Sequence, residues 1–320
     1  MQATAPIVVV TRPTLPGTGL ERLGRVAQLR QWSEVTPPPP ERLRDLLAGA
    51  DALLCQNSDH VDAAVLEAGE RLRVLALPSA GYDGTDVVTA QARGVVVTNT
   101  PGVLHETTAD TAFALILMAR RRLLTAADSL RSGGWTGSRL DAYLGLDVAG
   151  ATLGLIGYGE IGQAVARRAI GFGMTVQHTL SRKPDDELSQ AVSLPKLLST
   201  SDVVSLHVPL TDQTRRLIGA DELAMMKPTA TLVNTARGGV VDEAALLAAL
   251  QAGRLHSAGL DVFDREPRNG VGDPLIQHER VAALPHIGSA TEATRARMVD
   301  LAVDNIIAVL NGEPPLTPVP

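Results

Sequence analysis

Three residues in the second half of the chain, Arg237, Glu266 and His286, have side-chain types suited to reduction of a 2-keto acid, and Asp261 lies between the first two. An arginine has a planar fork of donors that can bind a carboxylate and a neighbouring carbonyl together, and it favours the carbonyl oxygen as negative charge develops there. His286 can deliver the proton, because imidazole titrates near physiological pH. Glu266 can orient that ring and stabilise its charged form. A surface ion pair for Arg237 and a structural role for His286 are the alternatives.

A glycine-rich segment upstream has the form of a dinucleotide-binding turn. It lies between an apolar run, residues 151–156, and a segment with apolar residues at helical spacing, and it reads Gly157-Tyr158-Gly159-Glu160-Ile161-Gly162. The first glycine permits the tight turn, the second lets the backbone approach a pyrophosphate, and the third lets helix and strand pack closely. Because glycines also occur in ordinary turns, the flanking strand and helix carry this prediction.

The next apolar run, residues 174–178, completes a strand-helix-strand unit whose end selects the cofactor. An acidic residue there binds the ribose 2′-hydroxyl of NAD, whereas an arginine accommodates the 2′-phosphate of NADP. Leu180 is not acidic, and Ser181, Arg182 and Lys183 follow it. The sequence therefore favours NADP over NAD, with a solvated loop before an acidic stretch as the alternative.

Composition limits the class of protein. The chain has 320 residues, of which 45% are hydrophobic, enough for about two domains with their own cores. The apolar stretch at residues 112–118 ends at three arginines, far short of the roughly 20 residues of a membrane span. The N-terminus lacks the charged start and long apolar core of a secretion signal. We therefore expect a cytoplasmic protein that does not contact a membrane.

The charge and the cysteine content exclude other kinds of site. A net charge of −6, with no basic run longer than three arginines, argues against nucleic acid as a partner. The single cysteine, Cys55, can form neither an internal disulfide nor a cysteine-rich metal site. Its apolar neighbours predict a buried strand residue rather than a nucleophile. We predict no metal site.

Short apolar runs alternate with helical patterns from the first residues onward, which is typical of parallel α/β layers. The predicted strands of the first part are 7–10, 52–55, 74–77 and 95–97; its predicted helices lie near 20–30, 41–49, 62–69 and 86–92; later strands are predicted at 203–208, 231–234, 257–260 and 281–284. Residues 106–131 contain no glycine or proline, so they predict one long helix that bridges two domains.

Several separate motifs, in a fixed order, carry a resemblance to a known family. They are Asn99-Thr100-Pro101-Gly102-Val103-Leu104, Thr107-Thr108-Ala109-Asp110, the glycine loop, His207-Val208-Pro209-Leu210-Thr211, Asn234-Thr235-Ala236-Arg237-Gly238, Gly259-Leu260-Asp261-Val262-Phe263, Glu266-Pro267 and Leu284-Pro285-His286-Ile287-Gly288-Ser289-Ala290. Over nearly its whole length the chain resembles the D-isomer-specific 2-hydroxyacid dehydrogenases, and within them the glyoxylate/hydroxypyruvate reductases.

The resemblance implies an α/β fold of two doubly wound parallel-sheet domains. A Rossmann-type dinucleotide-binding domain at residues 100–289 would be inserted into a flavodoxin-like substrate domain at residues 1–99 and 290–320. The active site would lie in the cleft between them.

The resemblance also assigns individual residues. Arg237, Glu266 and His286 form the implied catalytic set. Backbone N–H groups of Ala80 and Gly81, in a segment similar to the family's substrate loop, would hold the substrate carboxylate together with Arg237 and His286. The implied cofactor contacts are Gly157, Tyr158, Gly159, Glu160, Ile161, Gly162, Ser181, Arg182, Lys183, His207, Pro209, Thr235, Ala236, Arg237, Asp261, His286 and Gly288. Asp261 would support the nicotinamide ring or the local charge balance, and His207 would be structural or contact through its backbone.

A two-fold homodimer through the nucleotide domains is expected, both because the resemblance implies it and because closed pairs are the commonest assembly. Trp135, one of two tryptophans, matches a place from which some reductases of this group reach into the neighbouring subunit's pocket. Packing at the end of the long helix is the equal alternative.

Three functions compete. The first is NAD(P)H-dependent reduction of glyoxylate or hydroxypyruvate to the D-2-hydroxy acid. The second is the same kind of enzyme acting on a bulkier 2-keto acid, on 3-phosphoglycerate or on phosphite. A phosphate-bearing substrate is disfavoured because the loops near Ala80 and at residues 56–59 supply no cation. The third is a nicotinamide-sensing corepressor or scaffold, which the complete Arg-Glu-His set disfavours.

Overall fold

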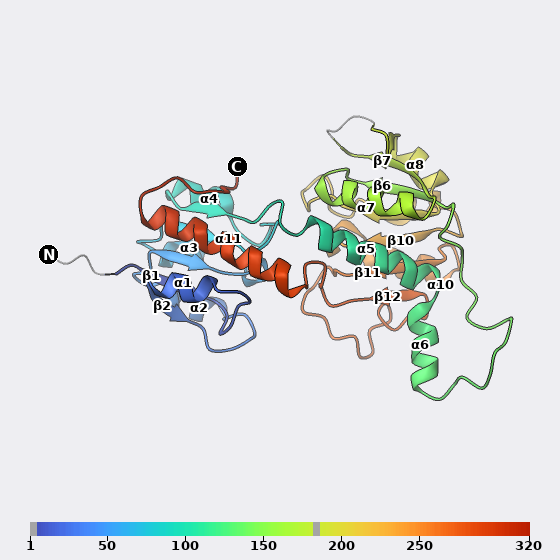
Figure 1. The fold of residues 1–320 in the computed structure, drawn as a ribbon, viewed down its shortest axis with the longest axis horizontal. Coiled ribbons are helices and arrows are strands. Elements are labelled where there is room, and N and C mark those ends of the chain that lie inside the picture. The colour runs from blue at the N-terminus through green and yellow to red at the C-terminus, as the bar shows by residue number, and fades with distance from the viewer. Residues whose placement is uncertain (1–4, 182–185) are drawn as a thin grey trace. The chain divides into compact units, whose positions relative to one another are not determined.

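The computed structural model describes residues 5–181 and 186–320, which form two compact units (Figure 1). The first unit combines the chain up to Leu104 with Ser289–Pro320, and the second unit is His105–Gly288. Because both ends of the chain belong to the first unit, the second is inserted into it.

The first unit is built on a parallel sheet in the order β2-β1-β3-β4-β5, the order of flavodoxin-like folds. Its strands are β1 (Ile7–Val10), β2 (Gln28–Gln31), β3 (Ala52–Leu54), β4 (Val74–Ala76) and β5 (Val96–Thr98). Its helices are α1 (Gly19–Gly24), α2 (Pro40–Leu47), α3 (Ala63–Ala68), α4 (Val87–Ala92) and α11 (Glu292–Leu310), with a short 3-10 turn, η1 (Asn57–Asp59).

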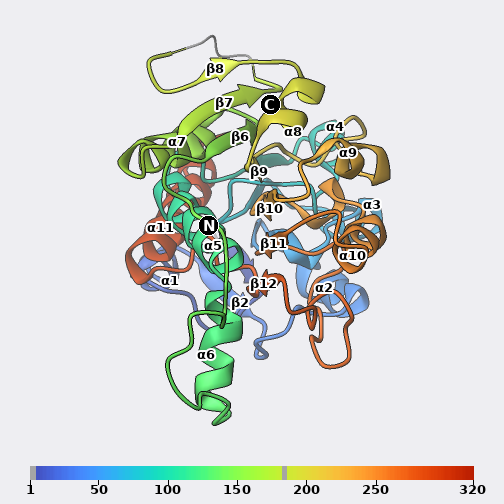
Figure 2. The same cartoon turned by 90° about the vertical axis from the view of Figure 1, so that its right-hand side faces the viewer.

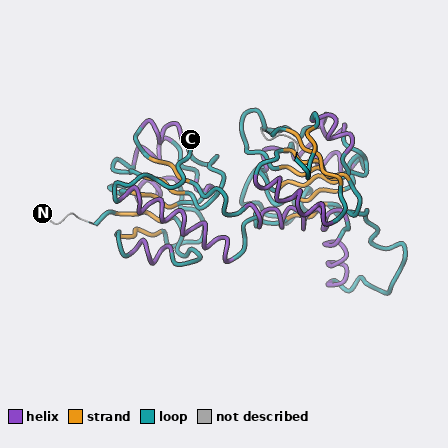
Figure 3. The backbone as a smooth tube through the Cα atoms, turned by 45° about the horizontal axis from the view of Figure 1, so that its top comes forward, coloured by secondary structure: helices purple, strands orange, loops and turns teal. Residues whose placement is uncertain are grey.

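Both faces of this sheet are covered by helices (Figure 3). Successive residues of β1 belong to different cores: Val9 packs with residues of α2 and α3, whereas Val8 and Val10 pack with residues of α1 and α11. A strand buried on both faces reads as a continuous apolar run, because neither face needs polar residues. This is why β1, β3, β4 and β5 were predicted from the sequence.

The prediction of a helix near residues 20–30 is confirmed for the first part of this range, where α1 lies, and is wrong for the rest. α1 ends at Gly24, and β2 begins at Gln28 and pairs only with β1, so it forms an edge of the sheet. Its sequence, Gln-Leu-Arg-Gln, is exposed at both ends and lacks an apolar run. An edge strand needs fewer apolar residues than a central one, which leaves little signal in the sequence.

The second unit is built on a seven-stranded parallel sheet in the order β12-β11-β10-β9-β6-β7-β8. Its strands are β6 (Thr152–Ile156), β7 (Thr175–Thr179), β8 (Gln190–Ala191), β9 (Val203–Leu206), β10 (Thr231–Asn234), β11 (Ser257–Leu260) and β12 (Val281–Ala283). Its helices are α5 (His105–Arg120), α6 (Leu123–Arg131), α7 (Glu160–Gly171), α8 (Leu194–Thr200), α9 (Ala220–Met225) and α10 (Glu243–Gln251), with a second 3-10 turn, η2 (Gly238–Val240).

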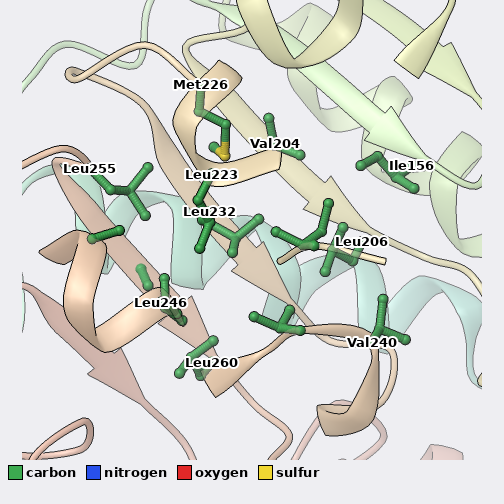
Figure 4. Packing of buried hydrophobic residues seen from close by; sticks show 14 of the residues in the cluster. Ile156, Val204, Leu206, Leu223, Met226, Leu232, Val240, Leu246, Leu255 and Leu260 are labelled. Atoms are coloured by element: carbon green, nitrogen blue, oxygen red, sulfur yellow. The ribbon is translucent and has the colours of Figure 1, made fainter. Parts of the chain in front are cut away.

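Helices cover both faces of this sheet as well (Figure 2). α5 and α7 contribute to one core, which includes Leu115 and Val165. The other core joins strands β9 to β11 to α8, α9 and α10 through Leu197, Leu223 and Leu246. Figure 4 shows part of this core, including Leu223 and Leu246. The prediction of two parallel-sheet α/β domains, one of Rossmann type, is confirmed.

The single long helix predicted at residues 106–131 is two helices. α5 ends at Arg120 and α6 begins at Leu123, because Arg122 adopts a left-handed backbone conformation with φ of +54°. A carbonyl at the end of α5 is hydrogen-bonded by the chain that follows α6: the Leu146 N–H donates to the Arg120 carbonyl at 2.9 Å. No glycine or proline marks this break, so the sequence could not reveal it. Among the helices of the described residues, none is long and apolar enough to span a lipid bilayer.

Candidate active site

The glycine loop joins β6 to α7, and each of its three glycines has its own steric setting. Gly157 has φ of +96°, and a Cβ on it would lie 2.6 Å from the His207 carbonyl oxygen. A Cβ on Gly162 would lie 2.4 Å from the Gly157 carbonyl oxygen, so α7 packs closely on the turn. A Cβ on Gly159, which caps α7, would meet no atom within 4 Å. The loop therefore has a closed inner side and an open outer side, which suits a pyrophosphate at the helix N-terminus.

The side chain of Tyr158 points into the unit rather than toward a ligand. It is 1% exposed, its ring stacks on the His178 ring with centroids 4.2 Å apart, and its hydroxyl donates to the Asp186 carboxylate at 2.8 Å. Burial, together with the hydrogen bond to Asp186, raises the pKa of Tyr158 above its usual value, so the hydroxyl stays protonated. Only the backbone of Tyr158 can serve the cofactor.

The end of β7, where the cofactor would be selected, is described in part. Leu180 has φ of +50° and is half exposed, and the Ser181 hydroxyl lies 3.5 Å from the Tyr158 carbonyl oxygen. This places the segment beside the glycine loop. Arg182 and Lys183, which were predicted to meet a 2′-phosphate, lie outside the described residues.

His207 follows β9 and packs against the glycine loop through its backbone. Its N–H donates to the Ile156 carbonyl at 2.7 Å, and its Nε2 lies 2.9 Å from the Ser205 hydroxyl. Burial lowers the pKa of His207 to about 3, so the ring is neutral. The neighbouring Pro209 is exposed, and its carbonyl accepts from the Thr214 hydroxyl at 2.6 Å. The geometry agrees with a structural His207.

Arg237 leaves the end of β10 on a turn tied together by Asn234. The Asn234 amide accepts from the Ala236 N–H at 3.0 Å and donates to the Arg237 carbonyl at 2.9 Å. The Arg237 guanidinium donates to the Ala236 carbonyl at 2.8 Å. Thr235 and Ala236 are buried in this turn, and Arg237 is half-buried. Asn234 thus fixes the backbone from which the guanidinium extends, a role that the sequence did not reveal.

Glu266 and His286 form a direct pair. The Nδ1 atom of His286, just beyond β12, lies 2.6 Å from Oε2 of Glu266, and the other carboxylate oxygen accepts from the Phe263 N–H at 2.8 Å. Burial raises the pKa of Glu266, but the hydrogen bond to His286 and the charges of His286 and Arg237 lower it to a value below the usual one. Glu266 is therefore ionised, and with Nδ1 held by it, the Nε2 atom of His286 is the nitrogen that can meet a substrate.

Asp261 follows β11 and binds the backbone of three consecutive residues. Its carbonyl accepts from the His286 N–H at 2.8 Å, and its carboxylate accepts from the N–H groups of Ile287 at 2.7 Å and Gly288 at 2.8 Å. Burial raises the pKa of the Asp261 carboxyl in spite of these bonds. His286 has φ of +53°, an unfavourable conformation for a residue other than glycine, which surrounding contacts must maintain. Asp261 therefore holds His286 in place.

The three acidic and basic groups of the predicted catalytic set thus come together within the second unit. Arg237 and His286 follow the carboxyl ends of β10 and β12, and Glu266 lies in the segment that follows β11, the strand between these two in the sheet. Arg237 lies near enough for its charge to act on Glu266. Carboxyl ends of parallel strands meet at one edge of a sheet, the usual place for a site in such folds.

The segment of Ala80 and Gly81 belongs to the first unit, and its carbonyl groups are all engaged there. The Thr100 N–H donates to the Ser79 carbonyl at 2.8 Å, the Asn99 side chain to the Ala80 carbonyl at 2.7 Å, and the Ser79 hydroxyl to the Gly81 carbonyl at 2.6 Å. No described residue accepts a hydrogen bond from the N–H of Ala80 or Gly81. A loop whose carbonyls are tied back and whose N–H groups are open can bind an anion.

The structure corrects one expectation about the first unit. We expected no cation near residues 56–59, but Arg12 from the end of β1 lies there, with its Nη2 atom 2.6 Å from Oδ1 of Asp59 and 3.2 Å from Oε1 of Gln56. The Asp59 side chain is fully buried and Arg12 is nearly so, hence each charge is matched by the other. The sequence missed this cation because 47 residues separate the partners.

The comparisons with known proteins agree with this geometry. Residues 113–288 match the family model described as D-isomer specific 2-hydroxyacid dehydrogenase, NAD binding domain. A glyoxylate reductase of Korarchaeum cryptofilum is 46% identical over 315 residues, which covers 97% of this chain and 94% of that protein. A glyoxylate/hydroxypyruvate reductase B of Escherichia coli is 44% identical over 310 residues, 95% of either chain.

Solved structures agree as well. An NADPH-dependent glyoxylate/hydroxypyruvate reductase from Sinorhizobium meliloti, crystallised with NADP and malonate, is 35% identical and has a TM-score of 0.88, covering 99% of this chain and 97% of that one. The matched model spans more than half of the sequence, and the relatives cover nearly all of it. The chain therefore belongs to the family of D-isomer specific 2-hydroxyacid dehydrogenases and carries that family's NAD-binding domain.

Proposed function

We propose that this chain reduces glyoxylate or hydroxypyruvate to the D-2-hydroxy acid with NAD(P)H. The observation that carries the proposal is the His286–Glu266 pair, with a separation of 2.6 Å, next to Arg237 at the ends of neighbouring strands. The relatives named glyoxylate reductase and glyoxylate/hydroxypyruvate reductase support the choice of substrate.

The chain's own residues would divide the chemistry among themselves. A bound reduced nicotinamide supplies the hydride that goes to the keto carbon. His286 gives a proton from Nε2 to the keto oxygen, while Glu266 at Nδ1 stabilises the imidazolium before transfer. Arg237 holds the substrate carboxylate and favours the oxygen as it becomes negative. One hydride and one proton convert the ketone to the hydroxyl group.

Substrate positioning would also use the first unit. We infer that the N–H groups of Ala80 and Gly81 bind the substrate carboxylate, since the carbonyls of this segment are already engaged. The malonate in the Sinorhizobium relative shows that a protein of this family can hold a small carboxylate, which agrees with this assignment.

We propose a preference for NADP over NAD. Leu180 places no carboxylate at the end of β7, where NAD-binding chains present one to the ribose. The Sinorhizobium relative binds NADP. Leu180→Asp combined with Arg182→Ala is expected to lower the ratio of kcat/KM with NADPH to that with NADH; an unchanged ratio would show that this strand end does not select the cofactor.

We propose a homodimer formed through α6 and the segment after it, which extend away from the sheet of the second unit (Figure 1). α6 has no buried residue, and the side chains of Leu130, Trp135, Leu140 and Leu144 are 58–99% exposed. Apolar residues gathered on a projecting segment usually mark an interface. Light scattering should give twice the mass of the 33.6 kDa chain. Leu130→Lys with Leu140→Lys should give the monomer; a monomeric wild type would refute the proposal.

Initial rates test the central proposal. Glyoxylate and hydroxypyruvate are each assayed with NADPH and NADH, and the loss of reduced nicotinamide is followed. We expect turnover that is fastest with NADPH. No turnover with either acid and either cofactor would overturn the proposal and direct the search to bulkier 2-keto acids, phosphite and then a role without turnover.

A further inference from the structure

The carboxylate of Glu243 holds both sides of the turn that carries Glu266. Glu243 is the first residue of α10, and its Oε1 atom accepts from the Asp264 N–H at 2.8 Å, two residues before Glu266. Its Oε2 atom pairs with the Nη1 atom of Arg268, two residues after Glu266. A single side chain from a helix therefore fixes the entry and the exit of this turn.

Arg268 is itself held by further contacts. Its Nε atom pairs with Asp273, whose carboxylate also accepts from the N–H groups of Leu275 and Ile276. Its guanidinium lies over the Phe263 ring, 5.3 Å from the ring centroid. The side chains of Glu243, Arg268 and Asp273 are only 12–21% exposed, so solvent screens these charges weakly. The arginine thus links the turn to the chain that leads into β12.

The turn needs such external support, because Glu266 lies in the irregular segment between β11 and β12. Its own backbone-directed bond, to the Phe263 N–H, is local to the turn and moves with it. It cannot fix the distance to His286, which extends from beyond the next strand. Glu243 is 21 and 25 residues away in sequence from its partners Asp264 and Arg268, so its contacts can hold the turn at a fixed distance from His286.

The same segment that carries Glu243 also carries Arg237. A Cβ on Gly238 would lie 1.8 Å from the Phe263 carbonyl carbon, so the backbone beside Arg237 packs directly on the turn. Gly238 opens η2, after which Asp242 caps α10 through the Ala245 N–H at 3.0 Å. The chain from Arg237 to Glu243 therefore meets the Glu266 turn at both its ends.

We propose that Glu243, acting with Arg268, is a positioning residue for the reaction: it sets the place of the Glu266 carboxylate and through it the orientation and charge of the His286 ring. The inference rests on the proposed function, in which His286 is the proton donor. The charged groups that face Glu266 are His286, Arg237 and Asp261, and none of them would be replaced in the test.

The first test is kinetic. In Glu243→Ala both supports of the turn are lost, and we expect kcat with glyoxylate to fall about 5- to 30-fold while KM for NADPH changes less than about twofold. The alkaline limb of the kcat/KM profile should move to lower pH, because an imidazolium that loses its carboxylate is less stable. Glu243→Gln keeps an acceptor for the Asp264 N–H, so its kcat should lie between those of Glu243→Ala and the wild type. This variant also allows the test if Glu243→Ala does not fold.

Glu222→Ala is the matched control. Glu222 accepts from the Gly219 N–H at 3.1 Å at the start of α9 and so makes the same kind of bond in the same unit, outside the segment that carries Glu266. A residue that merely stabilises a helix end should lower the melting temperature without altering kcat or the pH profile. If Glu243→Ala behaved as Glu222→Ala does, the proposal would be overturned.

A double-mutant cycle decides whether Glu243 acts through Glu266. In the Glu266→Gln background, Glu243→Ala should lower kcat no further than about twofold, whereas independent effects would multiply. If the two reductions in kcat multiplied, the proposal would be refuted. The NMR titration of the His286 ring, recorded without substrate, should also shift to lower pH in Glu243→Ala. The NMR titration does not require turnover. It therefore tests the positioning even if glyoxylate and hydroxypyruvate are not the substrates.

Discussion

Replacing Glu266 by Gln removes the negative charge beside His286 while keeping the shape of the side chain. The amide oxygen can still accept from the Phe263 N–H or from Nδ1 of His286, so the site need not collapse. What is lost is the stabilisation of the imidazolium, the species that donates the proton in the proposed reaction.

The magnitude follows from the exposure of the pair. The side chain of His286 is 51% exposed and that of Glu266 is 30% exposed, at a separation of 2.6 Å. Fully exposed ion pairs contribute about 0.2–1 kcal/mol, and breaking a buried pair costs about 3–5 kcal/mol. A half-buried pair should lie between these limits, at about 1.5–2.5 kcal/mol. Each 1.36 kcal/mol is a factor of ten in rate, so kcat should fall roughly 10- to 70-fold.

The assay is the initial rate with glyoxylate and saturating NADPH across a pH series. We expect the loss in kcat to be larger at alkaline than at acidic pH, because acid restores the imidazolium without help from Glu266. Isothermal titration with NADPH should show unchanged affinity and so controls for the fold. A kcat within twofold of the wild type at every pH would refute the role of this carboxylate.

Four further outcomes are expected. His286→Gln should lower kcat about 100-fold or more with little change in KM, since a proton donor acts mainly in the transition state; equal turnover would remove it from the mechanism. Arg237→Lys should lower kcat/KM for glyoxylate about 10- to 100-fold without weakening NADPH binding, because the bidentate fork is lost. Gly162→Ala should cost about 1–3 kcal/mol in urea unfolding, because its Cβ would meet the Gly157 carbonyl at 2.4 Å; an unchanged midpoint would contradict this. Because the pKa of Glu266 is lower in the folded protein than in the unfolded chain, its ionisation raises the free energy of unfolding above about pH 4.3, the pKa in the unfolded chain. This contribution is lost as the pH falls through the lower pKa of the folded protein. The free energies of unfolding of the wild type and of Glu266→Gln should therefore become equal at acidic pH.

The central strands could be predicted because they are buried on both faces. β1, β10 and β11 were found as apolar runs within a residue of their ends, since a parallel strand between helix layers has no polar face. β2 gave no such signal, because an edge strand is partly solvated. The break between α5 and α6 gave none either, since Arg122 adopts a positive φ that sequence patterns assign to glycine.

The sequence by itself determined the kind of chemistry, because proton donation and carboxylate binding depend on side-chain types that stand in a recognisable order in the chain. Arg237, Glu266 and His286 could be named for this reason. The tertiary structure alone decided how these groups are held: the Asp261 carboxylate accepts from the N–H groups of Ile287 and Gly288, directly after His286, and Glu243 spans the turn of Glu266. Such contacts join residues 21 to 27 positions apart and use common side chains with no periodic pattern. Only folding, which brings strand ends and a helix start to one edge of a sheet, makes them neighbours.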